Sequence, residues 1–310
     1  MDSKDVDLSV ALGRLRLRNP VMPASGTFGY GKEYSDFLNL QDLGAILVKG
    51  TTLHPKIGSF QPRFTEIARC ASFLNIGLQN VGVENFISDK LPYLRQFGTP
   101  VIVNISGESV DDFIKLAERL DHTPGVSAIE INLTCPNVKE GGVQFSANPD
   151  MTFRVVQSVR NATGLAIISK YSPSGADSTV LARACEEAGA DAVCPNYNVV
   201  GLAIDIYTRR PKLGKNLLGA VGGPWKKPIA VRLVWQVAQA VRIPVIGCGG
   251  ITGAEDAIEF FIAGATAIEI GTQSFINPRV TVETVEGIRR FLLEKKMQSI
   301  SELIGTMESP

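Results

Sequence analysis

The chain has 310 residues, of which 45% are hydrophobic and 20% charged, a composition typical of a globular protein with one large core. Its 31 basic and 31 acidic side chains cancel, so the sequence lacks the basic field needed to bind nucleic acid or an anionic membrane. No apolar run approaches the ~20 residues of a membrane span, and residues 1–17 lack the apolar core of a signal peptide. We therefore expect a cytoplasmic protein.

Eight short apolar runs with β propensity recur along the chain, and stretches of helical periodicity lie between and after them. The runs span residues 20–25, 45–49, 101–106, 128–133, 166–170, 192–196, 245–249 and 267–271. The amphipathic stretches include residues 109–120, 178–188, 229–241, 254–263 and 280–295. This order predicts an α/β protein, and eight units favour a closed (β/α)8 TIM barrel over an open doubly wound sheet. We expect a single domain over residues 1–310.

Two connections are too long for simple turns. Residues 50–82 follow the second predicted strand, and residues 197–228 follow the sixth. Long loops in compact domains are usually functional, and loops that follow barrel strands rise from the carboxyl-end face, where active sites are built. We expect both connections to border the site.

Polar residues cluster at the ends of the predicted strands. They are Ser25, Lys49, Asn104, Asn132, Lys170 and the segment from Asn196 to Asn198. A barrel brings all strand ends to one mouth, so these side chains are expected to line one pocket. The alternative is that each is an ordinary solvated loop residue.

The last two predicted strands end in glycine-rich segments, residues 247–251 and 269–272. Glycine lets a backbone approach an anion closely, and barrels commonly bind phosphate at this position. The segments predict a phosphorylated ligand, with tight strand-to-helix turning as the alternative.

Cysteines and histidines predict neither a disulfide framework nor a metal site. The five cysteines have no paired or Cys-x-x-Cys spacing, and neither histidine has a partner at metal-ligand spacing. Only Cys135 follows a strand end, on a loop with proline and glycines over residues 132–142. A thiol there can exchange protons near neutrality and suits a general base. The others, Cys70, Cys185, Cys194 and Cys248, are expected to be small core residues.

At this point the sequence resembles a known family, the class 1 dihydroorotate dehydrogenases, especially their B subtype. The resemblance spans nearly the whole chain, and its motifs are residues 19–31, 48–52, 76–80, 132–142, 208–211 and 249–251. The loop around Cys135 is the most specific of them. Class 2 relatives carry a serine base and an amino-terminal membrane helix, and this sequence has neither feature.

The resemblance implies FMN as the cofactor and a set of residues that contact it. These are Ala24, Ser25, Gly26, Lys49, Asn104, Asn132, Lys170, Gly222 and Gly223, with the phosphate on Gly249, Gly250, Gly271 and Thr272. Substrate contacts are implied for Lys49, Asn75, Ile76, Gly77, Leu78, Asn132, Asn137 and Asn198. Cys135 would take the C5 proton of dihydroorotate while hydride leaves C6 for flavin N5, with Lys49 and Lys170 stabilising the reduced flavin.

The resemblance also implies partners. B-type relatives work with a separate iron-sulfur flavoprotein subunit, carrying FAD, that passes electrons to NAD, and class 1 relatives form homodimers. This sequence has no iron-sulfur cysteine cluster and no Gly-x-Gly-x-x-Gly after a strand, so the cluster and the second nucleotide would belong to the partner.

Several positions depart from the family pattern. An ungapped comparison puts Leu74 where the family has asparagine, and Asn75 is displaced by one. Tyr197 occupies a second position where the family has a ring-binding amide, and Ser174 occupies a position where the family has asparagine. The segment before Ile76 looks like the pyrimidine domain of dihydropyrimidine dehydrogenase.

Three alternatives therefore stay open. The first is an FMN enzyme acting on another dihydropyrimidine or a cyclic enone. The second is a non-redox barrel with Lys170 as a Schiff base, and the third is a flavin-binding subunit that lost catalysis.

Overall fold

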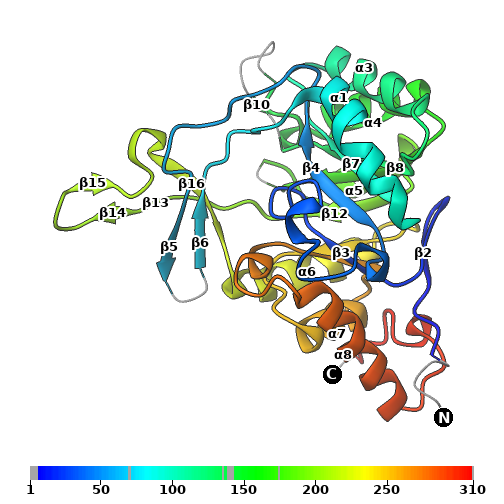
Figure 1. Cartoon of the computed structure of the whole chain (residues 1–310). Helices are drawn as coiled ribbons and strands as arrows, with labels where there is room; N and C mark the ends of the chain where they lie inside the picture. The colour runs from blue at the N-terminus through cyan, green and yellow to red at the C-terminus, as the bar shows by residue number, and fades with distance from the viewer. Residues whose placement is uncertain (1–5, 69–70, 135, 138–142, 174, 309–310) are drawn as a thin grey trace.

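The computed structural model describes residues 6–68, 71–134, 136–137, 143–173 and 175–308. Two parallel sheets form its centre (Figure 1). A five-stranded sheet has the order β12-β11-β8-β7-β4, and a three-stranded sheet has the order β17-β18-β3. The bounds are β3 Val21–Pro23, β4 Ile46–Thr51, β7 Val101–Ile105, β8 Ala128–Asn132, β11 Ala166–Tyr171, β12 Ala192–Pro195, β17 Ile246–Cys248 and β18 Ala267–Ile270.

Each of these strands begins and ends within two residues of its predicted position, which confirms the α/β class with a mostly parallel sheet. The two sheets also meet at their edges. Val193 in β12 forms a parallel bridge with Val245, just before β17. At the other edge the Gly44 amide, just before β4, donates to the Val21 carbonyl of β3 at 3.0 Å.

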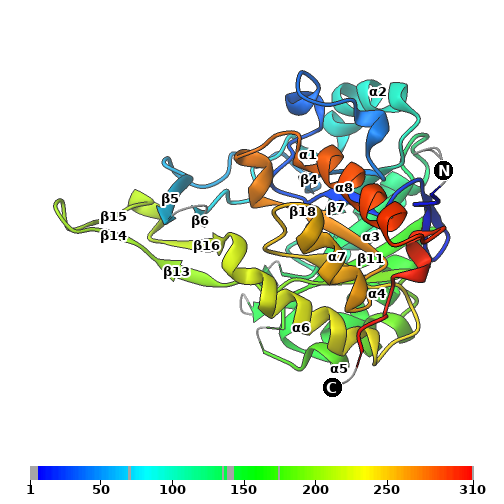
Figure 2. The ribbon, with the colours of Figure 1, turned by 90° about the horizontal axis from the view of Figure 1, so that it is seen from below.

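Helices cover the outer face of the strands (Figures 1 and 2). Helix α3 illustrates why they form: Ser109 caps its first turn, and its buried residues recur at helical spacing, from Phe113 through Leu116 to Leu120. The long helices are α3 Val110–Asp121, α4 Pro149–Ala162, α5 Ser178–Glu187, α6 Lys227–Ala238, α7 Ala254–Ile262 and α8 Val280–Glu294. All but α4 match named amphipathic stretches of the sequence.

Shorter helices, α1 Gly82–Asn85 and α2 Leu91–Leu94, follow the first long connection. Within the described part of the chain, no helix combines the length and the apolar character that crossing a bilayer would need.

Apolar side chains form two cores. The larger cluster lies between strands and helices and runs from Val6 to Leu303. A smaller cluster gathers side chains from the opposite face of the strands, including Leu47 and Ile168, with residues of an amino-terminal hairpin. That hairpin consists of β1 Val10–Leu12 and β2 Leu15–Leu17, which the sequence analysis does not predict.

The two long connections pair with each other instead of forming separate loops. Strands β5 Phe64–Ala68 and β6 Ala71–Leu74 from the first join β13 Val200–Leu202 and β16 Leu218–Gly222 from the second, in the antiparallel order β13-β16-β6-β5. The second connection also contains a small hairpin, β14 Ile204–Asp205 and β15 Arg210–Pro211. Together these strands form an arm that projects from the body in both views (Figures 1 and 2).

Candidate functional site

A cavity of about 480 Å³ lies where the central strands end and the arm begins. Its wall comes from segments that follow β3, β8, β17 and β18, together with residues of β6 and β16. A volume of this size suits a cofactor or another small molecule.

Most of the residues predicted for the site line this one cavity. They are Ala24, Ser25, Gly26, Asn75, Ile76, Gly77, Leu78, Asn132, Lys170, Asn198, Gly222, Gly223, Gly249, Gly250, Gly271 and Thr272. Cys135 and Ser174 lie outside the described residues. Asn137 is described through its backbone, which pairs with Val143 between the short strands β9 Pro136–Asn137 and β10 Val143–Gln144.

Lys49 and Asn104 are not part of the cavity wall. The Lys49 ammonium lies 5.8 Å from the centre of the Tyr30 ring, and burial lowers its pKa against the opposing charge of Glu33. Asn104 is buried, and its Oδ1 atom has no hydrogen-bond partner among the described residues. A Cβ added to Gly50 would lie 3.2 Å from that oxygen, so Asn104 lies directly behind the glycine.

The glycines of the cavity bring bare backbone to its wall. Gly250 has φ +79°, and a Cβ there would lie 2.3 Å from the Lys227 amide nitrogen. A Cβ on Gly222 would lie 2.5 Å from the hydroxyls of Ser72 and Thr272. Only glycine fits these positions without a shift of its neighbours.

The Lys170 side chain extends from β11 into a buried charged network. Its ammonium lies 3.4 Å from both carboxylate oxygens of Glu130 in β8, contacts the Glu269 carboxylate of β18, and is 3.4 Å from the Ser25 hydroxyl. Glu130 and Glu269 are both 0% exposed. Burial alone would lower the pKa of Lys170, but the two glutamates outweigh it and raise the pKa well above its ordinary value.

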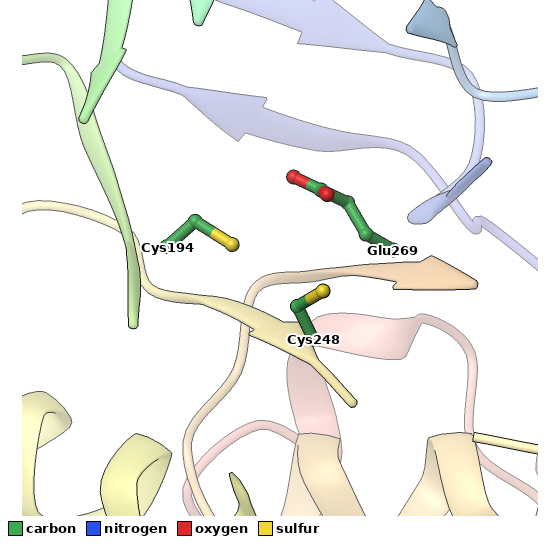
Figure 3. A group of neighbouring side chains, drawn as sticks. All are labelled: Cys194, Cys248 and Glu269. Carbon is green, nitrogen blue, oxygen red and sulfur yellow. The ribbon is translucent and has the colours of Figure 1, made fainter. Parts of the chain in front are cut away.

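Two thiols border this network. Figure 3 shows the side chains of Cys194, Cys248 and Glu269 pointing toward one another, and their sulfur and carboxylate atoms lie within 4.8 Å. The Cys194 thiol donates to Cys248, and together with the charges of Lys170 and Lys226 it lowers the pKa of Cys248 to about 6, against the effect of burial. Both cysteines are buried as predicted, but their neighbours are charged, and Cys248 borders the cavity.

The residues that depart from the family pattern differ in whether they line the cavity. Asn75 lines it, with its amide oxygen accepting from Ser59 at 2.6 Å and its amide nitrogen donating to the Leu218 carbonyl at 2.9 Å. Asn196 and Asn198 also line it, whereas Tyr197 between them is not in the wall and is 36% exposed. The loop therefore presents amides to the cavity on either side of the phenol.

Sequence reasoning missed the buried charges around Lys170. Glu130 and Glu269 lie in the middle of strand runs that are otherwise apolar, and Lys226 begins no recognisable motif. A carboxylate inside an apolar strand is the signal that could have found the two glutamates, because charged groups are rarely buried without a partner.

Comparison with known proteins agrees with this geometry. The sequence profile of the Dihydroorotate dehydrogenase family matches residues 7–292. The chain is 48% identical over 302 residues to "Dihydroorotate dehydrogenase B (NAD(+)), catalytic subunit" of Geotalea uraniireducens, covering 97% of this chain and 98% of that protein. It is 49% identical over 302 residues to the protein of the same name from Trichlorobacter lovleyi, with the same coverage. A third of that name, from Thermoanaerobacter pseudethanolicus, is 46% identical over 303 residues, covering 98% of this chain and 99% of that protein. The chain belongs to the dihydroorotate dehydrogenase family.

Proposed function

We propose that this chain is an FMN-dependent catalytic subunit that oxidises dihydroorotate to orotate in pyrimidine biosynthesis. The observation that carries the proposal is the cavity at the strand ends, which gathers most of the predicted cofactor and substrate residues in a member of this family. Reaction on another dihydropyrimidine or a cyclic enone is not favoured, because the relatives share one name and Tyr197 lies outside the cavity wall.

The residues present fit FMN. Gly249, Gly250, Gly271 and Thr272 would hold its phosphate, where a side chain on Gly250 would meet backbone. The unpaired Oδ1 of Asn104 is a buried acceptor beside Gly50, suited to a donor of the flavin ring. When bound, FMN supplies the acceptor for the hydride that leaves the substrate.

The chain's own groups hold the reactants and handle the proton. Lys170 keeps a positive charge beside the cavity, which favours the reduced cofactor. Asn75, Asn132 and Asn198 would orient the substrate ring through their amides. The base is Cys135, a role assigned by its sequence motif.

The state of Lys170 also argues against a Schiff-base enzyme. A nucleophilic lysine must lose its proton, usually with a pKa lowered by desolvation. Here the flanking carboxylates raise the pKa of Lys170, so its amine is held as an ammonium.

We infer a closed (β/α)8 barrel as one domain over residues 1–310. The bridge between Val193 and Val245 and the bond from Gly44 to Val21 support closure, because they join the two parallel sheets at both edges. One apolar cluster runs from Val6 to Leu303, which supports a single domain.

We also propose two protein partners. The relatives are named catalytic subunits, which supports a separate electron-transfer subunit with an iron-sulfur cluster and FAD. A second copy of this chain is supported by the arm, where large apolar side chains are exposed: Ile206 is 76% and Tyr207 90% exposed.

The test is anaerobic reduction of the FMN-loaded protein by a panel of substrates. Dihydroorotate should bleach the flavin absorbance. Dihydrouracil, and the saturated ketone that corresponds to a cyclic enone, should reduce the flavin much more slowly. Extraction of FAD in place of FMN, or bleaching by dihydrouracil alone, would contradict the proposed function.

A further inference from the structure

Two carboxyl groups, two thiols and two lysines meet beside the cavity. Glu130 and Glu269 flank Lys170, while Cys248 is influenced by the charges of both Lys170 and Lys226. The Lys226 ammonium donates to Asn196 Oδ1 at 3.3 Å, and Cys194 adds a thiol beside Cys248. These are the titratable groups that β8, β11, β12, β17, β18 and the segment before α6 direct at one another.

Charge balance around Lys170 requires one neutral acid. The single Lys170 ammonium contacts the carboxyl groups of both Glu130 and Glu269, and it compensates one negative charge. A second ionised carboxylate beside it would be an uncompensated charge at 0% exposure, which costs far more than taking up a proton.

We propose that Glu130 and Glu269 form an unequal carboxyl pair, in which ionised Glu130 is the counterion of Lys170 and Glu269 holds a proton. Both are positioning residues: they fix the place and the net charge of the Lys170 ammonium, and thereby the redox potential of the bound flavin. The inference rests on the FMN of the proposed function.

Hydrogen bonding assigns the charge to Glu130. The Asn104 Nδ2 atom donates to Glu130 Oε1 at 2.6 Å, and the Lys170 ammonium faces both Glu130 oxygens. Donors aimed at a carboxylate favour its ionised form. The amide of Asn104 therefore distinguishes two glutamates that both contact the same lysine.

The surroundings of Glu269 assign the proton to it. Burial and the charge of Glu130 raise its pKa, and its buried Oε1 atom has no hydrogen-bond donor among the described residues, which disfavours the ionised form. The sulfur of Cys248 lies within 4.8 Å and adds a further negative neighbour. A neutral carboxyl still accepts the bond from Lys170 through its carbonyl oxygen.

The unequal pair predicts different effects of a single and a double isosteric substitution. Glu269→Gln replaces a neutral acid by a neutral amide, so the equilibrium constant for flavin reduction should change less than threefold. The double variant Glu130→Gln/Glu269→Gln removes the counterion of Lys170 and also the acid that could ionise in its place, and the uncompensated cation should raise that constant at least tenfold, about 30 mV for a two-electron couple. Glu118→Gln, an exposed residue of α3, is the matched control and should change nothing.

The experiment is a potentiometric titration of FMN-loaded wild type and variants, reduced photochemically without dihydroorotate. Equal shifts in the two variants, or a larger shift in Glu269→Gln, would overturn the pair. If the double variant does not hold FMN, the infrared spectrum decides: wild type at neutral pH should show the carbonyl stretch of a protonated carboxylic acid that Glu269→Gln lacks, and its absence refutes the inference. A chain that binds no FMN refutes the proposed function instead.

Discussion

Gly250 offers the sharpest test of the cofactor site, because the Cβ atom of an alanine there would collide with backbone atoms of Lys227. Its φ of +79° is strained for alanine, at a cost of roughly 1–3 kcal/mol. The new Cβ would also lie 2.3 Å from the Lys227 amide nitrogen and 2.8 Å from its Cα, where α6 begins. Since α6 must then move away from the glycine segment, we expect FMN to bind at least ten times more weakly, about 1.4 kcal/mol.

Alanine substitutions at two neighbouring glycines distinguish the effect of backbone strain from the effect of a steric collision. Gly249 has φ +121°, but its Cβ would meet atoms only at 3.5 Å, so Gly249→Ala introduces strain alone. Gly253 has no atom within 4 Å and extended backbone, so Gly253→Ala should match wild type. FMN affinity is measured by fluorescence titration and stability by urea unfolding of the apoprotein. The reasoning is refuted if Gly250→Ala binds FMN as tightly as Gly253→Ala does.

Three further predictions concern the base, the arm and acid stability. Cys135→Ala should lower the rate of dihydroorotate-driven flavin reduction about 10²- to 10⁴-fold at neutral pH while FMN stays bound. Cys135→Ser should regain flavin reduction only toward alkaline pH. Stopped-flow rates of Cys135→Ala near those of wild type would place the base elsewhere. Tyr207→Asp should shift the mass from dimer to monomer by light scattering, and an unchanged dimer would exclude the arm as the interface. Burial would raise the pKa of Asp256, but hydrogen bonds from Lys227 and Thr252 outweigh burial and lower it. The Asp256 carboxylate therefore stabilises the folded protein above the unfolded-state pKa of about 4, and this stabilisation is lost as pH falls through the lower pKa of the folded state. Asp256→Asn should therefore lower the unfolding temperature at pH 7 and lose that effect in acid; an equal deficit at both pH values would contradict the assignment.

The central strands could be predicted from sequence because most of their residues are apolar and buried. Strands β7 and β11, for example, are buried at every residue. The arm could not be predicted in the same way. Its register pairs Leu74 of β6 with Ala220 of β16, and neither short run carries a periodicity that identifies its distant partner.

The site was predictable where residues follow strand ends, because the topology brings those ends together. Lys170 was found for that reason. Its counterion was not, because Glu130 occupies the middle of β8 and is identified only by what it contacts across two neighbouring strands. Sequence position predicts which residues reach the cavity, whereas the charge state of a buried group depends on contacts between strands.

The segment from Asn196 to Asn198 is where sequence comparison and geometry differ most. Ungapped comparison puts Tyr197 at an amide position of the family, which suggested a changed substrate. The structure instead places Asn198 in the cavity wall and Tyr197 outside it. We therefore expect Tyr197→Asn to change kcat/KM for dihydroorotate less than about threefold, since loss of an exposed side chain leaves no buried group unpaired.

Asn198→Ala removes an amide that lines the cavity, and an unpaired substrate group costs roughly 1–3 kcal/mol, or about 5- to 150-fold in kcat/KM. Steady-state kinetics of both variants with dihydroorotate and dihydrouracil make the comparison. A gain in dihydroorotate turnover by Tyr197→Asn, with Asn198→Ala unaffected, would mean that the phenol and not the neighbouring amide faces the substrate.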